Sequence, residues 1–119
     1  MKSIDIDLEI RLSDLGPQFL RELELLEPYG IGNPKPVFLT RGLRVKKIQT
    51  KKIKSSFRAQ FWVTDGNLIY EMTVPARARI EHDFESSELF DLVYTIDQRS
   101  WEGEPVTVLE AKDVKSPET

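Results

Sequence analysis

The sequence contains no cysteine and a single histidine among its 119 residues. Without cysteine the chain has no disulfides and no thiolate ligands for a metal. No apolar run approaches the roughly 18 residues that span a bilayer, and no signal peptide opens the chain. We therefore expect a cytoplasmic protein that has no membrane partner and folds around a hydrophobic core.

Motifs that carry catalysis are missing as well. The sequence has no Ser/His/Asp set, no phosphate-binding loop and no dinucleotide fingerprint. His82 lies among Glu81, Asp83 and Glu85, which are all metal-ligand types. Consecutive residues do not converge on one point, so their spacing disfavours a metal site. We expect no catalytic residue, metal or cofactor in this chain, and no enzyme activity of its own.

What the chain does contain is a globular composition with segregated charge. Apolar residues make up 39% and charged residues 31%, as in a soluble domain that buries a real core. The net charge is −3, yet Lys35 to Arg79 holds eleven Lys or Arg and two acids. Between Arg41 and Thr64 there are eight cations and no acid. This segregation indicates either a surface for a polyanion or a solvated basic hairpin.

The first 28 residues predict a strand followed by a helix. Apolar and charged residues alternate strictly from Ile4 to Leu12, which is typical of a half-buried strand. Ser13 and Asp14 are possible helix caps, and Pro17 favours a first helical turn. An apolar stripe at helical spacing then runs toward Pro28, formed by Leu15, Phe19, Leu23 and Leu26.

Residues 29–36 are a loop by composition. They include two glycines, which free the backbone, and two prolines, which fix φ and remove two donors. Two interpretations remain open for this loop. It is either a rigid linker between the helix and the following strands, or a segment that contacts a ligand directly.

Strands dominate from residue 37 onward. Period-two patterns predict strands over 37–48, 53–64, 67–74, 90–96 and 106–114, with turns at Lys51–Lys52, Asp65–Gly66 and Glu102–Gly103. Residues 75–88 are expected to hold a short helix. Three meandering strands, a short helix and two more strands is the order of the OB-fold. We therefore predict a mainly β protein, a five-stranded OB-fold barrel with a helix between strands 3 and 4, preceded by an N-terminal strand and helix.

The segment from Leu26 to Phe38 reads Leu-Glu-Pro-Tyr-Gly-Ile-Gly-Asn-Pro-Lys-Pro-Val-Phe. It resembles the segment that leads into the C-terminal OB domain of RecJ-type exonucleases. Phe90 to Tyr94, Trp101 to Gly103 and Lys112 to Val114 resemble the closing strands of that domain. The resemblance implies three parts: residues 1–28 arriving from a preceding domain, a Gly/Pro loop over 29–36, and the OB domain over 37–119.

The resemblance also implies a function. It indicates the single-stranded-DNA-binding domain of a RecJ-like 5′-to-3′ exonuclease that serves DNA repair and recombination. The catalytic domains, with divalent Mn or Mg, would lie outside this chain. The implied partners are single-stranded DNA, the remaining domains of the parent exonuclease and a single-strand-binding protein.

Binding a DNA strand requires cations for phosphates and π-faces for bases. Residues that alternate with core positions on the first two barrel strands, and lysines at the turn between them, meet this requirement. The candidate nucleic-acid-binding residues are Arg44, Lys46, Lys51, Lys52, Lys54, Arg58 and Trp62. Trp62 is the preferred stacking platform, or else a structural residue covered by the N-terminal segment. Phe57 and Phe61 are assigned to the core, and Trp101 to packing in its turn.

A protein-interaction or intramolecular docking module is the alternative function. Its basic face would meet an acidic partner instead of DNA. The alternating row from Ile4 to Leu12 would pair with strands of an upstream domain. In the chain by itself, this row is expected to add an edge strand or to form a homodimer.

Overall fold

A computed structural model of the protein describes residues 5–30, 32–53, 56–84 and 88–117. For residues 49–53, 56–59 and 101 the description is limited to the backbone. The strands are β1 (Leu8–Glu9), β2 (Phe38–Ile53), β3 (Ser56–Thr64), β4 (Ile69–Thr73), β5 (Phe90–Trp101) and β6 (Glu104–Lys115). The helical elements are η1 (Leu12–Asp14), α1 (Pro17–Glu24) and η2 (Ala76–Ala78). No helix in the described ranges is long and apolar enough to cross a membrane.

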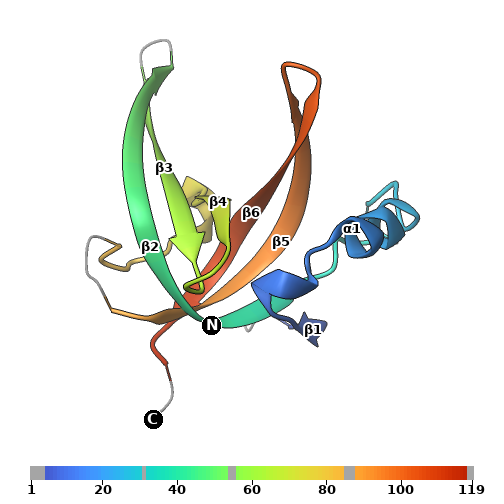
Figure 1. Cartoon of the computed structure of the whole chain (residues 1–119), viewed down its shortest axis with the longest axis horizontal. Coiled ribbons are helices and arrows are strands. Elements are labelled where there is room, and N and C mark those ends of the chain that lie inside the picture. The colour runs from blue at the N-terminus through green and yellow to red at the C-terminus, as the bar shows by residue number, and fades with distance from the viewer. Residues whose placement is uncertain (1–4, 31, 54–55, 85–87, 118–119) are drawn as a thin grey trace.

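Five of the strands close into a barrel (Figure 1). They are ordered β2-β3-β4-β6-β5, and β5 pairs back onto β2. Only the β4–β6 pair is parallel among these five, because the connection between β4 and β5 carries the chain across the barrel. This order, with a short helical turn between the third and fourth barrel strands, is that of an OB-fold. The sequence prediction of the fold class is confirmed.

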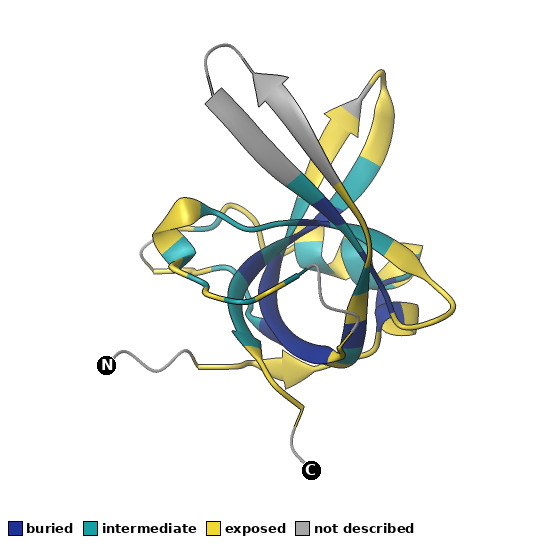
Figure 2. Ribbon diagram, turned by 90° about the vertical axis from the view of Figure 1, so that its left-hand side faces the viewer, coloured by how far each residue is buried: buried dark blue, intermediate teal, exposed yellow. Residues whose placement is uncertain are grey.

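The core lies inside the barrel and includes the N-terminal segment. Buried positions gather around the barrel in Figure 2. The buried cluster consists of Ile10, Leu12, Leu15, Phe38, Leu43, Phe61, Val63, Met72, Phe90, Leu92, Tyr94, Leu109 and Ala111. Thr40 donates to the Ile10 carbonyl at 2.9 Å, so the Tyr94 hydroxyl, 2.7 Å from Thr40 Oγ1, acts as the donor to Thr40. This buried chain of hydrogen bonds joins the N-terminal segment to two barrel strands.

The long N-terminal strand expected from alternation is wrong. β1 has two residues and runs parallel to β2, pairing Leu8 with Phe38. Beyond it, Ile10 and Leu12 enter the core, and the chain turns into η1 instead of continuing along the sheet edge. In the second half of the alternating pattern, burial in the core therefore replaces pairing along the sheet edge. The expected added edge strand is present, reduced to two residues.

The helix also differs in detail from its prediction. α1 begins at Pro17 with Gly16 as its N-cap, so Ser13 does not cap it. Instead, Asp14 accepts the Arg11 backbone N–H at 2.8 Å and closes η1. Phe19 packs edge-on against Phe38 at 5.6 Å between ring centroids. Phe19 and Leu23 therefore attach α1 to the barrel, whereas Leu26 lies beyond the helix and is 49% exposed.

The predicted turn at Lys51–Lys52 is also wrong. β2 continues to Ile53, and its register pairs Lys51 with Arg58 and Lys52 with Phe57. The strands stay paired as far as Ile53 and Ser56, so Lys51 and Lys52 belong to the ladder and not to its turn. At the other hairpin, Glu102 and Gly103 do have positive φ, of 52° and 82°. The turn predicted there is confirmed.

Two long hairpins extend from the barrel on the same side (Figure 1). β2 and β3 form one, and β5 and β6 form the other. In OB-folds, the corresponding loops flank the ligand-binding face of the second and third strands. These two strands are β3 and β4 in this chain, so this face is where a binding site is expected.

Candidate nucleic-acid interface

Trp62 lies on β3 with its side chain opposite the core. Its chain neighbours Phe61 and Val63 are both buried in the barrel, and side chains alternate along a strand. Trp62 itself is partly exposed. The prediction that it faces away from the core is confirmed, and part of its side chain is exposed to solvent.

A β-bulge in β2 decides which cation meets Trp62. The register shifts between Val45 and Lys47, so that Lys46 is the extra residue and Lys47 pairs with Trp62. The Lys47 ammonium lies 5.7 Å from the centroid of the Trp62 ring, which is a cation–π contact. Lys46 and Lys47 are both exposed. The bulge therefore adds Lys47 to the candidate interface.

Sequence reasoning missed Lys47 because it assumed unbroken alternation along β2. A signal was present, since Lys46 and Lys47 are two consecutive charged residues between the apolar residues Val45 and Ile48. A strand with one face in the core cannot keep that spacing without inserting one residue. This doublet is what indicates a bulge.

The backbone register extends this contact into a row across the barrel, here called the Trp62 row. Its members, in order across β2, β3, β4, β6 and β5, are Lys47, Trp62, Glu71, Val108 and Asp97. Glu71 is partly exposed, and Val108 is buried at 1% relative exposure. Directly opposed cross-strand residues have Cβ atoms about 4.5–5.5 Å apart. The row therefore places a cation, an aromatic ring and a carboxylate side by side.

Asp97 ends the row with its charge balanced. Its carboxylate oxygens lie 2.9 Å from Arg99 Nε and 3.9 Å from Lys35 Nζ. Glu71 differs, because no ion pair joins it to any residue that the structure describes. Within this row, the uncompensated acid is therefore the one next to the indole.

The other predicted residues divide by position. Arg44 is exposed on β2 and pairs with Thr64. Lys51 and Arg58 oppose each other in the backbone register, and Lys52 follows one pair further along. Lys54 falls outside the described residues. The backbone thus places Lys51, Lys52 and Arg58 on the same hairpin as Trp62, and their role stays a prediction.

The turn between β3 and β4 holds the two central strands in register. Asp65 Oδ1 accepts the backbone N–H groups of Asn67 and Leu68, each at 2.9 Å. These two hydrogen bonds, that of Leu68 foremost, lower the pKa of the Asp65 carboxyl. Gly66 takes a φ of 105° at the tip, which only glycine adopts readily. The predicted Asp65–Gly66 hairpin is confirmed, and it fixes how Trp62 opposes Glu71.

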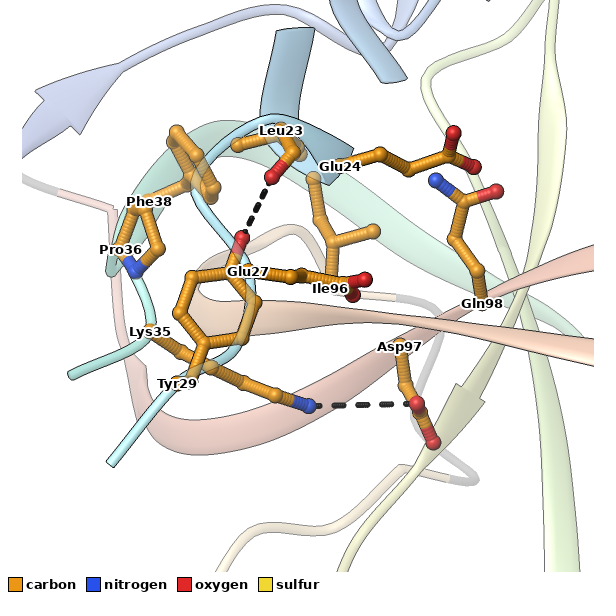
Figure 3. Close-up of a pocket in the computed structure, with 10 residues that line it drawn as sticks. All are labelled: Leu23, Glu24, Glu27, Tyr29, Lys35, Pro36, Phe38, Ile96, Asp97 and Gln98. Atoms are coloured by element: carbon orange, nitrogen blue, oxygen red, sulfur yellow. Dashed lines mark hydrogen bonds and ion pairs between the residues drawn. The ribbon is translucent and has the colours of Figure 1, made fainter. Parts of the chain in front are cut away.

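The Gly/Pro loop is fastened to the end of α1. Asn33 Nδ2 donates to the Leu26 carbonyl and, at 2.9 Å, to the Pro28 carbonyl, while the Tyr29 hydroxyl donates to the Leu23 carbonyl at 2.8 Å. Figure 3 shows Tyr29 beneath Leu23. Both residues line a cavity of about 50 Å³ between α1, the loop and β5. These contacts tie the loop to α1, as the rigid-linker interpretation predicts.

His82 packs among aromatic rings. Its ring centroid lies 4.8 Å from that of Phe84 and 5.4 Å from that of Phe90. In the described ranges no three His, Cys, Asp or Glu side chains are grouped to hold a metal ion. The contacts of His82 are those of a residue that covers the end of the barrel.

The chain is similar to known proteins over most of its length. Residues 6–113 match the family model of the RecJ OB domain. A 26-residue stretch is 69% identical to the single-stranded-DNA-specific exonuclease RecJ of Thermus thermophilus, covering 22% of this chain and 4% of that protein.

Two crystal structures of RecJ from Thermus thermophilus, one with Mn²⁺ and one with Mg²⁺, share the fold. Each has a TM-score of 0.53 and 24% sequence identity over 87% of this chain. The match spans 14% and 15% of those crystallised chains, respectively. On the family match, which covers nearly its whole length, this chain belongs to the RecJ OB domain family.

Proposed function

We propose that this chain binds single-stranded DNA along β2, β3 and β4 and holds the strand for a RecJ-type exonuclease. The catalytic domains of that exonuclease, with their divalent Mn or Mg, would lie outside this chain. The observation that carries the proposal is the pairing of Lys47 with Trp62 on the face opposite the core. A cation beside a partly exposed π-surface is the combination that sequence-tolerant strand binding needs.

Magnitudes favour the exchange of Lys47 for a base on the indole. A cation–π contact at an exposed site contributes about 0.5–1 kcal/mol, whereas base–aromatic stacking contributes roughly 1–3 kcal/mol per base. A base that displaces the ammonium from the ring therefore gains free energy. The released Lys47 ammonium is then close enough to pair with the phosphate of the same nucleotide.

The charge around the indole supports the same proposal. From Arg44 to Arg58 the sequence holds seven cations and no acid. A row of cations attracts the phosphate backbone and releases its counterions, which gives affinity without sequence preference. The hairpin would provide these contacts, while Trp62 would favour unpaired bases over a duplex.

The proposal is tested by fluorescence anisotropy of labelled oligo-dT and of a matched duplex across a salt series. We expect tighter binding to the single strand, with log affinity falling linearly as log salt rises, by about 0.7 per phosphate contact. The variant Arg21→Ala serves as a control, because it removes one positive charge from the exposed face of α1, far from the hairpin. No binding at low salt, or equal affinity for strand and duplex, would overturn the proposal.

A docking role toward the parent's other domains is the second candidate, and exposed apolar side chains favour it. Leu25, just after α1, is 81% exposed, and Leu8 in β1 is 51% exposed. Apolar residues this exposed in a folded domain often mark a contact surface. Leu8→Glu and Leu25→Glu should then weaken association with the separately purified catalytic domains while leaving oligo-dT binding unchanged. Unchanged association would exclude this role.

The other partners expected from the sequence can be tested with the same purified chain. Sedimentation of the chain alone tests the homodimer through β1, because Leu8→Glu should then convert a dimer to a monomer. Binding of a single-strand-binding protein is tested with its acidic tail as a labelled peptide. Both remain proposals beside the DNA-binding role.

A further inference from the structure

Glu71 occupies an unusual place for an acid on a DNA-binding face. It is the cross-strand neighbour of Trp62 on β4, and it is partly exposed. By contrast, Glu110, which lies two register pairs further along β4–β6, is held by Arg77 and by Lys112. No described residue forms an ion pair with Glu71. With respect to the part of the chain that the structure describes, its carboxylate is therefore available to accept hydrogen bonds from a ligand.

A free carboxylate repels phosphates but accepts hydrogen bonds from amino groups of bases. Among the pyrimidines, cytosine presents the N4 amino group, which is the group that Glu and Asp side chains accept from. Thymine and uracil present the O4 oxygen at that position, and their N3–H lies between two carbonyl oxygens. Glu71 would therefore attract the edge of cytosine and repel the edges of thymine and uracil.

The order of residues in the Trp62 row matches the order of groups in one nucleotide. Lys47 on β2 suits the phosphate, Trp62 on β3 suits the face of the base, and Glu71 on β4 suits its polar edge. Adjacent strands are about 4.8 Å apart, so the three side chains span about 10 Å. A nucleotide with its phosphate at Lys47 and its base on the indole thus directs the edge of that base toward β4.

We propose that Glu71 is a specificity determinant that favours cytosine over thymine or uracil at the base stacked on Trp62. This inference rests on the proposed binding of single-stranded DNA. It adds a base preference to an interface whose cations and aromatic ring do not distinguish bases. One hydrogen bond of ordinary net strength, at this partly exposed site, corresponds to about a fivefold preference.

The test compares oligo-dC with oligo-dU of equal length by anisotropy, at low salt and mildly alkaline pH. The two strands differ at the pyrimidine edge and share the sugar, the phosphates and the lack of a 5-methyl group. We expect the chain to bind oligo-dC about fivefold more tightly. In Glu71→Met this ratio should fall to about one, while affinity for oligo-dU rises because a negative charge is removed.

Glu22→Met is the matched control. Glu22 is an exposed acid on α1, so the substitution makes the same charge change away from the Trp62 row and should leave the ratio unchanged. Equal binding of the two strands by the unaltered chain, or a preference retained in Glu71→Met, would overturn the role of Glu71 alone. No binding to either strand would overturn both this inference and the proposed function.

Discussion

The two long hairpins of the barrel share their architecture and differ in charge. β2–β3 and β5–β6 are both antiparallel, contain register shifts and extend on the same side (Figure 1). The segment from Arg44 to Arg58 holds seven cations and no acid, whereas the segment from Asp97 to Glu104 holds three acids and one arginine. The fold supplies two equivalent hairpins, and side-chain charge decides which of them suits a polyanion.

The largest expected effect comes from reversing charge on the basic hairpin. We expect the triple substitution of Lys51, Lys52 and Lys54 by Glu to weaken oligo-dT binding by roughly a hundredfold at low salt. The salt slope should fall by about 2, because each lost phosphate contact on a single strand removes about 0.7. Anisotropy across a salt series measures both quantities.

The acidic hairpin provides the matched comparison. Glu102→Lys with Glu104→Lys removes two exposed acids from the β5–β6 turn region. If the strand lies along β2–β3, this change should raise affinity by only a few-fold, through the long-range field. A gain as large as the loss on the other hairpin would show that both hairpins contact DNA, and the comparison would fail.

The second effect concerns the barrel beneath both hairpins. Burial raises the pKa of the Tyr94 hydroxyl from 10.0 to about 12. Between these values the unfolded chain ionises at Tyr94 and the folded chain does not. The free energy of unfolding should therefore fall as pH rises through this window, by about 1.4 kcal/mol per pH unit at most. Urea denaturation at a series of pH values measures the slope.

Tyr94→Phe is the control for this slope. It removes the titrating group and also the hydrogen bond to Thr40. It should therefore lower the free energy of unfolding by about 1 kcal/mol at neutral pH. It should also reduce the fall of that free energy at alkaline pH. Some decline remains, since burial also raises the pKa of Tyr70. Neither hairpin changes charge, and the salt slope for oligo-dT should be unaffected. An alkaline decline as steep as that of the unaltered chain would contradict the assignment to Tyr94.

The third effect compares the tryptophans of the two hairpins. Trp62→Ala should weaken oligo-dT binding about tenfold through the loss of one stacking surface, and Trp62→Phe should retain most of the affinity. Trp101→Ala, on β5, should leave affinity nearly unchanged, because the sequence assigns this residue to packing in its turn. Anisotropy and thermal melts together separate lost stacking from lost stability. Equal losses at both tryptophans would contradict a site confined to the basic hairpin.

Local chemistry is what sequence reasoning predicted well. The Asp65–Gly66 and Glu102–Gly103 turns follow from residues that adopt positive φ, and the five barrel strands follow from period-two patterns. The N-terminal segment failed because alternation indicates one apolar face without showing what covers it. Ile10 and Leu12 pack against residues of the barrel core, and a local pattern does not reveal such distant contacts.

The candidate site could be predicted from the sequence only in part, for a related reason. Trp62 could be placed from its neighbours on one strand, since Phe61 and Val63 define the core face. Glu71 and Val108 could not be placed beside it, because their positions depend on registers among three strands, one of them parallel. The bulge at Lys46 lies between these cases, because the sequence signals it but the partner of Lys47 comes from the register.

The smallest expected effect uses Asp97, where the Trp62 row meets the acidic hairpin. Its carboxylate forms ion pairs with Arg99 and Lys35. Asp97→Asn should therefore release these two cations toward the side of the barrel from which both hairpins extend. Partly exposed ion pairs contribute about 0–1 kcal/mol, so stability should change little. Oligo-dT affinity should rise about twofold at low salt and lose this gain at high salt, where the Debye length shortens. Glu22→Gln on α1 controls for net charge, and if Asp97→Asn weakened binding instead, the order that Asp97 imposes on Arg99 and Lys35 would matter more to the strand than its negative charge.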